Sequence, residues 1–191
     1  NRKGVTRLCY CGSVLQTTPR GLVGTREPLQ IGAEIYGHGG IESDQEIQSL
    51  LFKSLQLCGI ENIHIDLGHV AIFRSICKHG EIAAQLEADL YGVLESKDTA
   101  QLEVLTNGLE RDTRTALLAL PNLYGDQSII DEARRVLPPH QEITDALHDL
   151  ERLLENSSYQ VNVDLADLRG YHYHSGTVFA AYVTGCANAI A

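Results

Sequence analysis

Alternating apolar and polar positions near the start of the chain predict a β-hairpin. Residues 7–15 mix β-branched, aromatic and small side chains, and residues 16–26 carry the Thr, Pro and Gly of a turn or long loop. The second strand is expected at residues 28–36, where side chains alternate strictly between two faces. One face holds Leu29, Ile31, Ala33 and Ile35, and the other holds Gln30, Gly32, Glu34 and Tyr36. We expect the apolar face to belong to the core.

The polar face of this second strand has two interpretations. Gly32 leaves bare backbone between Gln30 and Glu34, a shape suited to a small polar ligand. A solvated sheet face with a bulge at Gly32 gives the same pattern, because half-exposed antiparallel strands commonly alternate in this way. The pattern taken alone favours the solvated face.

Helical and strand periods then alternate along the chain. Residues 42–58 have apolar positions at helical spacing, acidic residues in the first turn and Gly59 just beyond the end. A strand through Ile63, Ile65 and Leu67 follows, and a helix is expected at residues 70–78.

Residues 80 to 157 differ from the rest of the chain in composition and in their helical pattern. They form short helical segments rich in Leu, Ala, Glu and Asp, with breaks at Asn107-Gly108, Pro121-Asn122 and Pro138-Pro139. Strands are expected on the far side, at residues 159–168 and 171–183. The prediction is an α+β domain with a mainly antiparallel sheet, flanking helices and a helical insertion at about 80–157.

Composition limits the classes of function. The 191 residues include 15 Lys and Arg against 25 Asp and Glu, a net charge of −10, which argues against a surface built to bind nucleic acid. No apolar run reaches the ~18 residues that a membrane span needs, and no secretion signal is present. The 5 cysteines are an odd number at scattered spacing, which indicates reduced thiols in the cytoplasm.

Methionine is absent from the chain, position 1 included. An ordinary gene product begins with Met unless it has been removed. We therefore expect the chain to be a fragment of a longer protein.

Common catalytic and metal motifs find little support. Cys9 with Cys11, and His172 with His174, each lie two residues apart, but no C-x-x-C or helical H-x-x-x-H spacing accompanies them. No serine lies in a G-x-S-x-G turn, and no glycine-rich phosphate loop is present. We expect neither a metal nor a cofactor. Arg20 and Arg26, in the hairpin loop, could bind an anion or be simply solvated.

The densest group of functional side chains is the segment LRGYHYHSGTVF, residues 168–179. Arg169 stands next to a glycine, and two tyrosines and two histidines follow, expected on alternating faces of one strand. Such a cluster is rarely a matter of packing alone.

These segments carry a resemblance to a known family. RLCYCGSVLQTTPRGLVGTREPLQIGAEIYG resembles the motif 2 hairpin of class II aminoacyl-tRNA synthetases in its histidyl-tRNA synthetase version, and LRGYHYHSGTVF resembles the histidine-binding motif of that enzyme. Four further segments are similar to a non-catalytic branch of this family, the ATP phosphoribosyltransferase regulatory subunits. They are IYGHGG, DLGHVAIFR, LPNLYG and GYHYHSGTVFAAY. The resemblance covers essentially the whole chain.

The resemblance implies a histidine-like pocket. Gln30 falls on the contact to the α-amino group, Glu34 on the acceptor for the imidazole, and Arg169 on the partner of the carboxylate. Tyr173 and His174 fall on the aromatic pair that closes the ring pocket, with His174 replacing a tyrosine.

The departures from the synthetase concern ATP. The arginine that holds the α-phosphate falls on Gln16, and the acidic residue that reads adenine falls on Thr18. Both charges are lost, and without the cation adenylation loses transition-state stabilisation. A protein that keeps the amino-acid pocket but lacks the residues that bind ATP is better suited to sensing an amino acid than to activating it.

The family implies a regulatory subunit without catalysis of its own, a homodimer within a hetero-oligomer with the short-form ATP phosphoribosyltransferase catalytic subunit, and histidine as effector. The alternatives are a histidyl-tRNA synthetase catalytic-core fragment and a scaffold whose pocket binds nothing.

Overall fold

The computed structural model describes residues 4–17, 25–155, 159–186 and 189–191. Contacts within the chain divide it into two compact units, residues 1–50 and residues 51–191. Each unit is described by itself below.

The first unit contains the expected hairpin. Strands β1 (Thr6–Ser13) and β2 (Leu29–Tyr36) pair antiparallel in a continuous register that sets Tyr10 opposite Gly32. Helix α1 (Ile41–Leu57) begins in this unit and continues into the second. Arg7 of β1 holds Glu46 of α1 through two hydrogen bonds, one of them 2.8 Å from Nη2 to Oε2.

The apolar face of β2 is not a buried core face, contrary to the sequence prediction. Leu29 is 72% exposed and Ile31 60% exposed, while Ala33 and Ile35 are half-buried. Among the described residues, this sheet consists of β1 and β2. Alternation shows which side chains share a face, but burial depends on a second layer that the pattern does not encode.

The second unit is organised around β3. Strand β3 (Ile63–His69) lies between β5 (Gln160–Asp164) and β6 (Thr177–Val183), and the short β4 (Tyr124–Gly125) adds to the far edge of β5. β3 pairs parallel with β5 and antiparallel with β6, and β4 pairs antiparallel with β5. The sheet is therefore antiparallel except at one pair. Ile65 and Leu67 of β3 are fully buried, as expected of a central strand.

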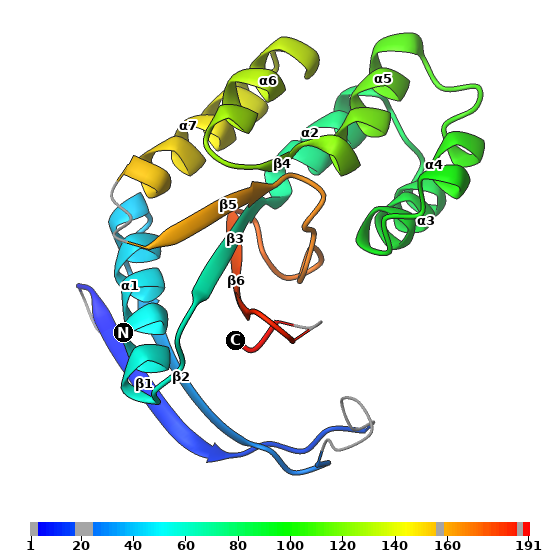
Figure 1. Cartoon of the computed structure of the whole chain (residues 1–191). Helices are drawn as coiled ribbons and strands as arrows, with labels where there is room; N and C mark the ends of the chain where they lie inside the picture. The colour runs from blue at the N-terminus through cyan, green and yellow to red at the C-terminus, as the bar shows by residue number, and fades with distance from the viewer. Residues whose placement is uncertain (1–3, 18–24, 156–158, 187–188) are drawn as a thin grey trace. The chain divides into compact units, whose positions relative to one another are not determined.

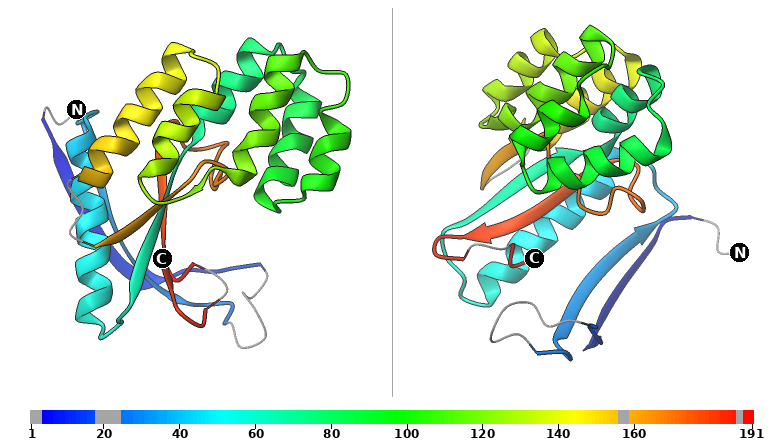
Figure 2. Two further views of the ribbon diagram at one scale, coloured as in Figure 1. Left: turned by 45° about the horizontal axis from the view of Figure 1, so that its top comes forward. Right: turned by 90° about the vertical axis from the view of Figure 1, so that its right-hand side faces the viewer.

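Six helices of this unit gather on one side of the sheet, as Figure 2 shows. They are α2 (Val70–His79), α3 (Ala84–Glu95), α4 (Thr99–Leu105), α5 (Arg111–Ala119), α6 (Ser128–Val136) and α7 (Gln141–Glu155). Among the described residues, no helix is long and apolar enough to cross a membrane.

The helix boundaries follow the predicted breaks in the sequence. Asn107-Gly108 separates α4 from α5, Pro121-Asn122 lies in the 3-10 turn Leu120–Asn122, and Pro138-Pro139 separates α6 from α7. Side chains cap the N-termini of α2, α4 and α5. His69 accepts from the backbone N–H of Ala71, Asp98 from that of Gln101, and Glu110 from that of Asp112. Residues 84–155 are thus mostly helical (Figure 1).

The segment after β5 is a loop, and the expectation of one strand over residues 171–183 is wrong in its first half. β6 begins only at Thr177. The backbone N–H groups of Tyr173 and His174 both donate to the carbonyl of Gly170, at 2.7 Å each. Gly170 has φ of +68°, a conformation that glycine adopts without strain. Local turn bonds thus replace the strand pairing that the residue pattern predicted.

Strand order fixes where this loop runs. β5 ends and β6 begins beside the carboxyl end of β3, in the registers Leu67↔Val163 and His69↔Thr177. The N–H of Val70, the first residue of α2, donates to the carbonyl of Gly176 at 3.1 Å. Residues 165–176 therefore cross the end of β3 where α2 starts.

We predict that Leu67→Ala lowers the free energy of unfolding by about 2–5 kcal/mol, because it leaves a cavity in the centre of the sheet. The matched control is Val104→Ala on α4, where the side chain is 65% exposed and the change should stay within about 0.5 kcal/mol. Urea unfolding of both variants measures the difference. Equal losses would contradict the central role of β3.

Candidate functional site

The five residues predicted for a histidine-like pocket belong to both units. Gln30 and Glu34 lie on β2 in the first unit, and Arg169, Tyr173 and His174 lie in the loop between β5 and β6 in the second. Each group has a defined local geometry. The convergence of all five on one ligand stays a prediction.

On the hairpin, Tyr10 covers Gly32. A Cβ added at Gly32 would lie 2.3 Å from Cζ of Tyr10, so only glycine leaves room for this ring. Nε2 of Gln30 donates to the Tyr10 hydroxyl at 2.8 Å. The register is continuous at Gly32, which rules out the alternative of a bulge at that residue. Sequence reasoning missed Tyr10, although its place opposite Gly32 follows from pairing the two strands.

Glu34 is exposed and accepts a hydrogen bond from the hydroxyl of Tyr36 on the same face. A carboxylate in this setting is available as an acceptor for a ring N–H. The polar face of β2 therefore presents one amide and one carboxylate, each bonded to a tyrosine hydroxyl.

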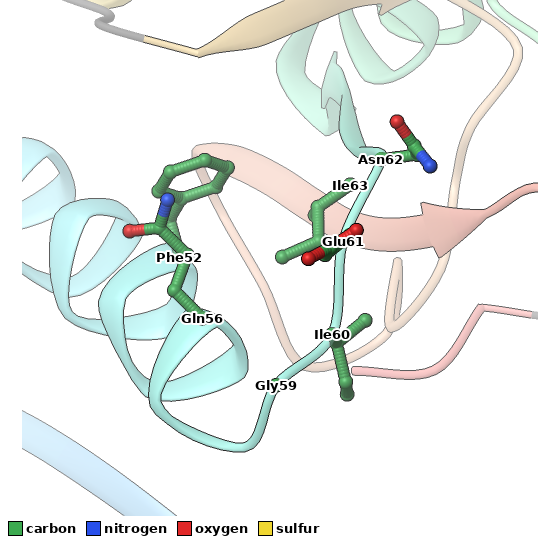
Figure 3. A pocket seen from close by; sticks show the side chains of 7 residues that line it. All are labelled: Phe52, Gln56, Gly59, Ile60, Glu61, Asn62 and Ile63. Carbon is green, nitrogen blue, oxygen red and sulfur yellow. The ribbon is translucent and has the colours of Figure 1, made fainter.

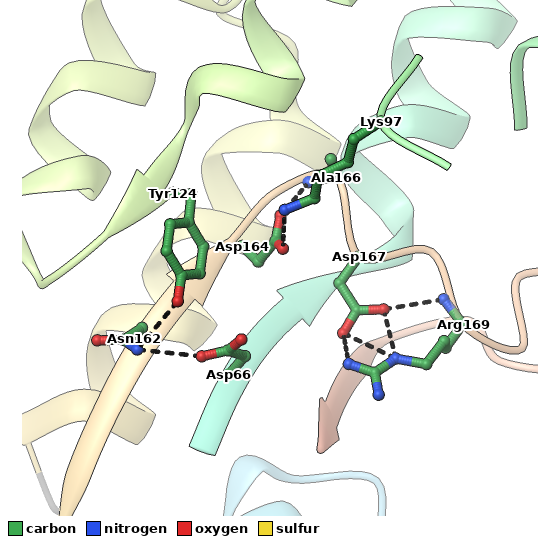
Figure 4. A network of polar contacts seen from close by, with 8 residues as sticks. All are labelled: Asp66, Lys97, Tyr124, Asn162, Asp164, Ala166, Asp167 and Arg169. Atoms are coloured by element: carbon green, nitrogen blue, oxygen red, sulfur yellow. Dashed lines mark hydrogen bonds and ion pairs between the residues drawn. The ribbon is translucent and has the colours of Figure 1, made fainter. Parts of the chain in front are cut away.

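In the loop, Arg169 is held by Asp167, as Figure 4 shows. Nε of Arg169 donates to Oδ1 of Asp167 at 2.9 Å, Nη2 donates to Oδ2, and the backbone N–H of Arg169 donates to Oδ1 at 3.1 Å. These bonds raise the pKa of Arg169. The guanidinium also lies over the ring of Tyr182, 5.5 Å from its centroid. Asp167 was not predicted, and its position two residues before Arg169 is the only sequence signal for it.

Tyr173 and His174 differ in their surroundings. Tyr173 is 90% exposed. The ring of His174 packs against Gly170, where an added Cβ would lie 2.3 Å from Cδ2, and meets the ring of Tyr173 edge-on with centroids 5.3 Å apart. The loop thus brings Arg169, Tyr173 and His174 together in one short stretch.

A second polar group lies beside this loop on the sheet (Figure 4). Nδ2 of Asn162 donates to Oδ1 of Asp66 at 3.1 Å, and Nζ of Lys97 donates to Oδ2 of Asp164 at 2.7 Å. Asp66 is 7% exposed, and burial raises its pKa. The cation of Lys97 also lies 5.0 Å from the centroid of the Tyr124 ring.

The described residues offer little support for other chemistry. None of their His, Cys, Asp and Glu side chains form a group of three or more that could hold a metal ion. Cys9 and Cys11 are exposed thiols. Nη2 of Arg26 donates to the carbonyl of Thr17 at 2.8 Å. Arg20 and Thr18 lie outside the described residues, and Gln16 is half-buried.

An open pocket of about 360 Å³ lies elsewhere in the second unit, where α1 ends and the chain enters β3 (Figure 3). It is lined by Phe52, Gln56, Gly59, Ile60, Glu61, Asn62 and Ile63. None of the five predicted pocket residues takes part in it.

Residues 1–191 match a family model described as histidyl-tRNA synthetase. Two similar curated proteins, from Nitrosospira multiformis and Burkholderia pseudomallei, are each named ATP phosphoribosyltransferase regulatory subunit. Each is 54% identical over 100% of this chain and 50% of its own length. The chain thus spans about half the length of these curated relatives.

Solved structures share the fold. An ATP phosphoribosyltransferase regulatory subunit/histidyl-tRNA synthetase from Bacillus halodurans has a TM-score of 0.83 at 24% identity, over 96% of this chain and 49% of its own. A chain of the ATP phosphoribosyl transferase (HisG:HisZ) complex from Thermotoga maritima has a TM-score of 0.71 at 17% identity, over 96% and 65%. The fold is therefore that of class II synthetase-like proteins.

We predict that Asp66→Asn flattens the pH dependence of stability. Because the folded state raises the pKa of this carboxyl above its unfolded value near 3.8, Asp66 favours folding when protonated and loses that contribution as pH rises through the folded pKa. Asparagine keeps the acceptor for Asn162 without the charge. From pH 4 upward, the free energy of unfolding should decline less in the variant than in the wild type. Parallel curves of this free energy against pH would contradict the raised pKa of Asp66.

Proposed function

The chain belongs to the histidyl-tRNA synthetase family, and we propose that it is part of a non-catalytic regulatory subunit of ATP phosphoribosyltransferase. The observation that carries the proposal is its similarity, along its whole length, to proteins of that name. The parent protein would assemble in the cytoplasm, as a homodimer within a hetero-oligomer, with the short-form catalytic subunit. It would be required for the first step of histidine synthesis and for feedback control by histidine.

The absence of catalysis is supported at the hairpin. Gln16 stands where the synthetase resemblance places an arginine for the α-phosphate, and its backbone N–H bonds to the carbonyl of Arg26 at 2.9 Å. A neutral amide provides less stabilisation than a guanidinium where phosphate charge develops. Activation of an amino acid by ATP is therefore not the activity that we propose.

Histidine is the proposed ligand of Gln30, Glu34, Arg169, Tyr173 and His174. Glu34 offers an acceptor for an imidazole N–H. Arg169 uses Nε and Nη2 on Asp167, and a guanidinium carries five N–H donors, so donors remain for a ligand carboxylate. The chemistry of these groups suits a zwitterion with an imidazole side chain.

Regulation requires that histidine bind two states of the assembly unequally. A ligand of equal affinity for both states shifts nothing, however tightly it binds. We therefore propose that histidine binds more tightly to the less active state of the assembly than to the more active one.

Assembly is tested by co-purifying the full-length protein with the short-form catalytic subunit and measuring phosphoribosyl transfer with and without histidine. We expect the subunit to raise the catalytic rate and histidine to lower it. No increase on adding the subunit would overturn the proposal.

Histidyl-tRNA synthetase activity is the second candidate, favoured by the name of the family model. Histidine-dependent exchange between pyrophosphate and ATP in the full-length protein would establish it and refute the regulatory proposal. We expect no such exchange.

We predict that Glu34→Gln weakens histidine binding by about tenfold, because glutamine keeps an acceptor oxygen but loses the negative charge that strengthens its hydrogen bond to the imidazole. The matched control is Glu61→Gln, which removes the same charge from the other pocket and should leave the affinity unchanged. Calorimetry on the full-length protein, alone and in the complex, measures both. Equal affinities in all three proteins would refute a histidine pocket at β2.

A further inference from the structure

The loop that carries three of the proposed ligand residues is anchored by the residue between them. Tyr171 is 4% exposed, whereas its neighbour Tyr173 is 90% exposed. The backbone N–H of Tyr171 donates to the carbonyl of Leu168 at 2.9 Å. Tyr171 thus turns inward between Arg169 and His174, which the sequence predicted to share a strand.

Aromatic rings surround the inward side chain. Phe73 of α2 meets the ring of Tyr171 edge-on at 5.3 Å between centroids, and Tyr91 of α3 stacks on it at 5.7 Å. His172 of the loop lies 5.3 Å from Tyr91. The ring is therefore held by two helices that are separate in the sequence from the loop.

The hydroxyl of Tyr171 donates to Oε1 of Glu87 on α3. Burial, and then this bond to the carboxylate, raise the pKa of Tyr171, so the phenol stays neutral and remains a donor. A hydrogen bond to a charged acceptor in a part-buried position is stronger than a neutral one. It ties the loop to the first turn of α3.

Arg74 of α2 holds the loop backbone from the other side. Its Nη2 donates to the carbonyl of Tyr171 at 2.9 Å and to that of His174 at 3.1 Å. The guanidinium lies 4.9 Å from the centroid of the Tyr171 ring. One cation thus holds the backbone both of the anchor, Tyr171, and of His174, one of the proposed ligand residues.

We propose that Tyr171, through its hydrogen bond to Glu87, is a positioning residue that holds Arg169, Tyr173 and His174 in the geometry that binds histidine. The identity of the ligand rests on the proposed function, but the positioning of the loop does not.

The decisive variants are made in the full-length protein. Tyr171→Phe removes one oxygen and keeps the ring, and Glu87→Ala removes the acceptor. Glu87→Gln keeps an oxygen that accepts from the phenol. Tyr91→Phe, the matched control, takes a hydroxyl from the same aromatic group and leaves the bond to Glu87 intact.

Two measurements are made on each variant: the dissociation constant for histidine, and hydrogen exchange of the backbone N–H groups of Tyr173 and His174 without histidine. We expect Tyr171→Phe and Glu87→Ala to weaken histidine binding by about tenfold and to speed exchange in the loop. Glu87→Gln should restore affinity to within about twofold of the wild type, and Tyr91→Phe should match the wild type.

The outcomes separate the two proposals. If the wild-type protein, alone and in complex, does not bind histidine, the histidine pocket falls, and the exchange rates still decide whether Tyr171 positions the loop. If Tyr171→Phe and Glu87→Ala leave both affinity and exchange unchanged, the positioning role is refuted. The positioning role is also refuted if Glu87→Gln binds histidine as weakly as Glu87→Ala does. Should Tyr171→Phe fail to fold, the two Glu87 variants decide the question.

Discussion

The placement of β3 between β5 and β6 is the constraint on which the loop of the candidate site depends. Because β5 runs parallel to β3 and β6 antiparallel, the chain between them must cross the carboxyl end of β3. Helix α2 begins at that end, so its residues Phe73 and Arg74 meet the loop directly. Sheet topology thus places the loop against α2 before any specific side-chain contact forms.

The groups proposed to bind a ligand already have partners within the chain. Gln30 donates to Tyr10, Glu34 accepts from Tyr36, and Arg169 pairs with Asp167. A ligand that binds these groups shares or replaces internal hydrogen bonds, so the net free energy of each contact is smaller than for an unpaired group. Modest net affinity would suit the reversible feedback that we propose, in which the effector must dissociate when its concentration falls.

Predictability differed among the elements for physical reasons. The helices of residues 84–155 follow from their breaks, because Pro and Gly act on the backbone locally. The prediction that Leu29 and Ile31 are buried was wrong for a different reason, since the exposure of a strand face depends on what packs against it. The polar residues Gln30, Glu34 and Arg169 were predicted as ligand residues from the pattern and the resemblance. Tyr10 and Asp167, which contact two of them, were not predicted, because these contacts depend on pairing across strands and within turns, which local periodicity does not encode.

The sequence by itself determined the class of fold, the hairpin, the helical region and the family, since these rest on local periodicity and on motifs that survive as residue identities. Only the tertiary structure decided that residues 170–174 turn instead of extending, and that Tyr171 points inward to Glu87 while Tyr173 faces solvent. The reason is that Tyr171 and Glu87 are 84 residues apart. Their contact exists only because the strand order of β5, β3 and β6 carries the loop to the helices, and no local pattern records it.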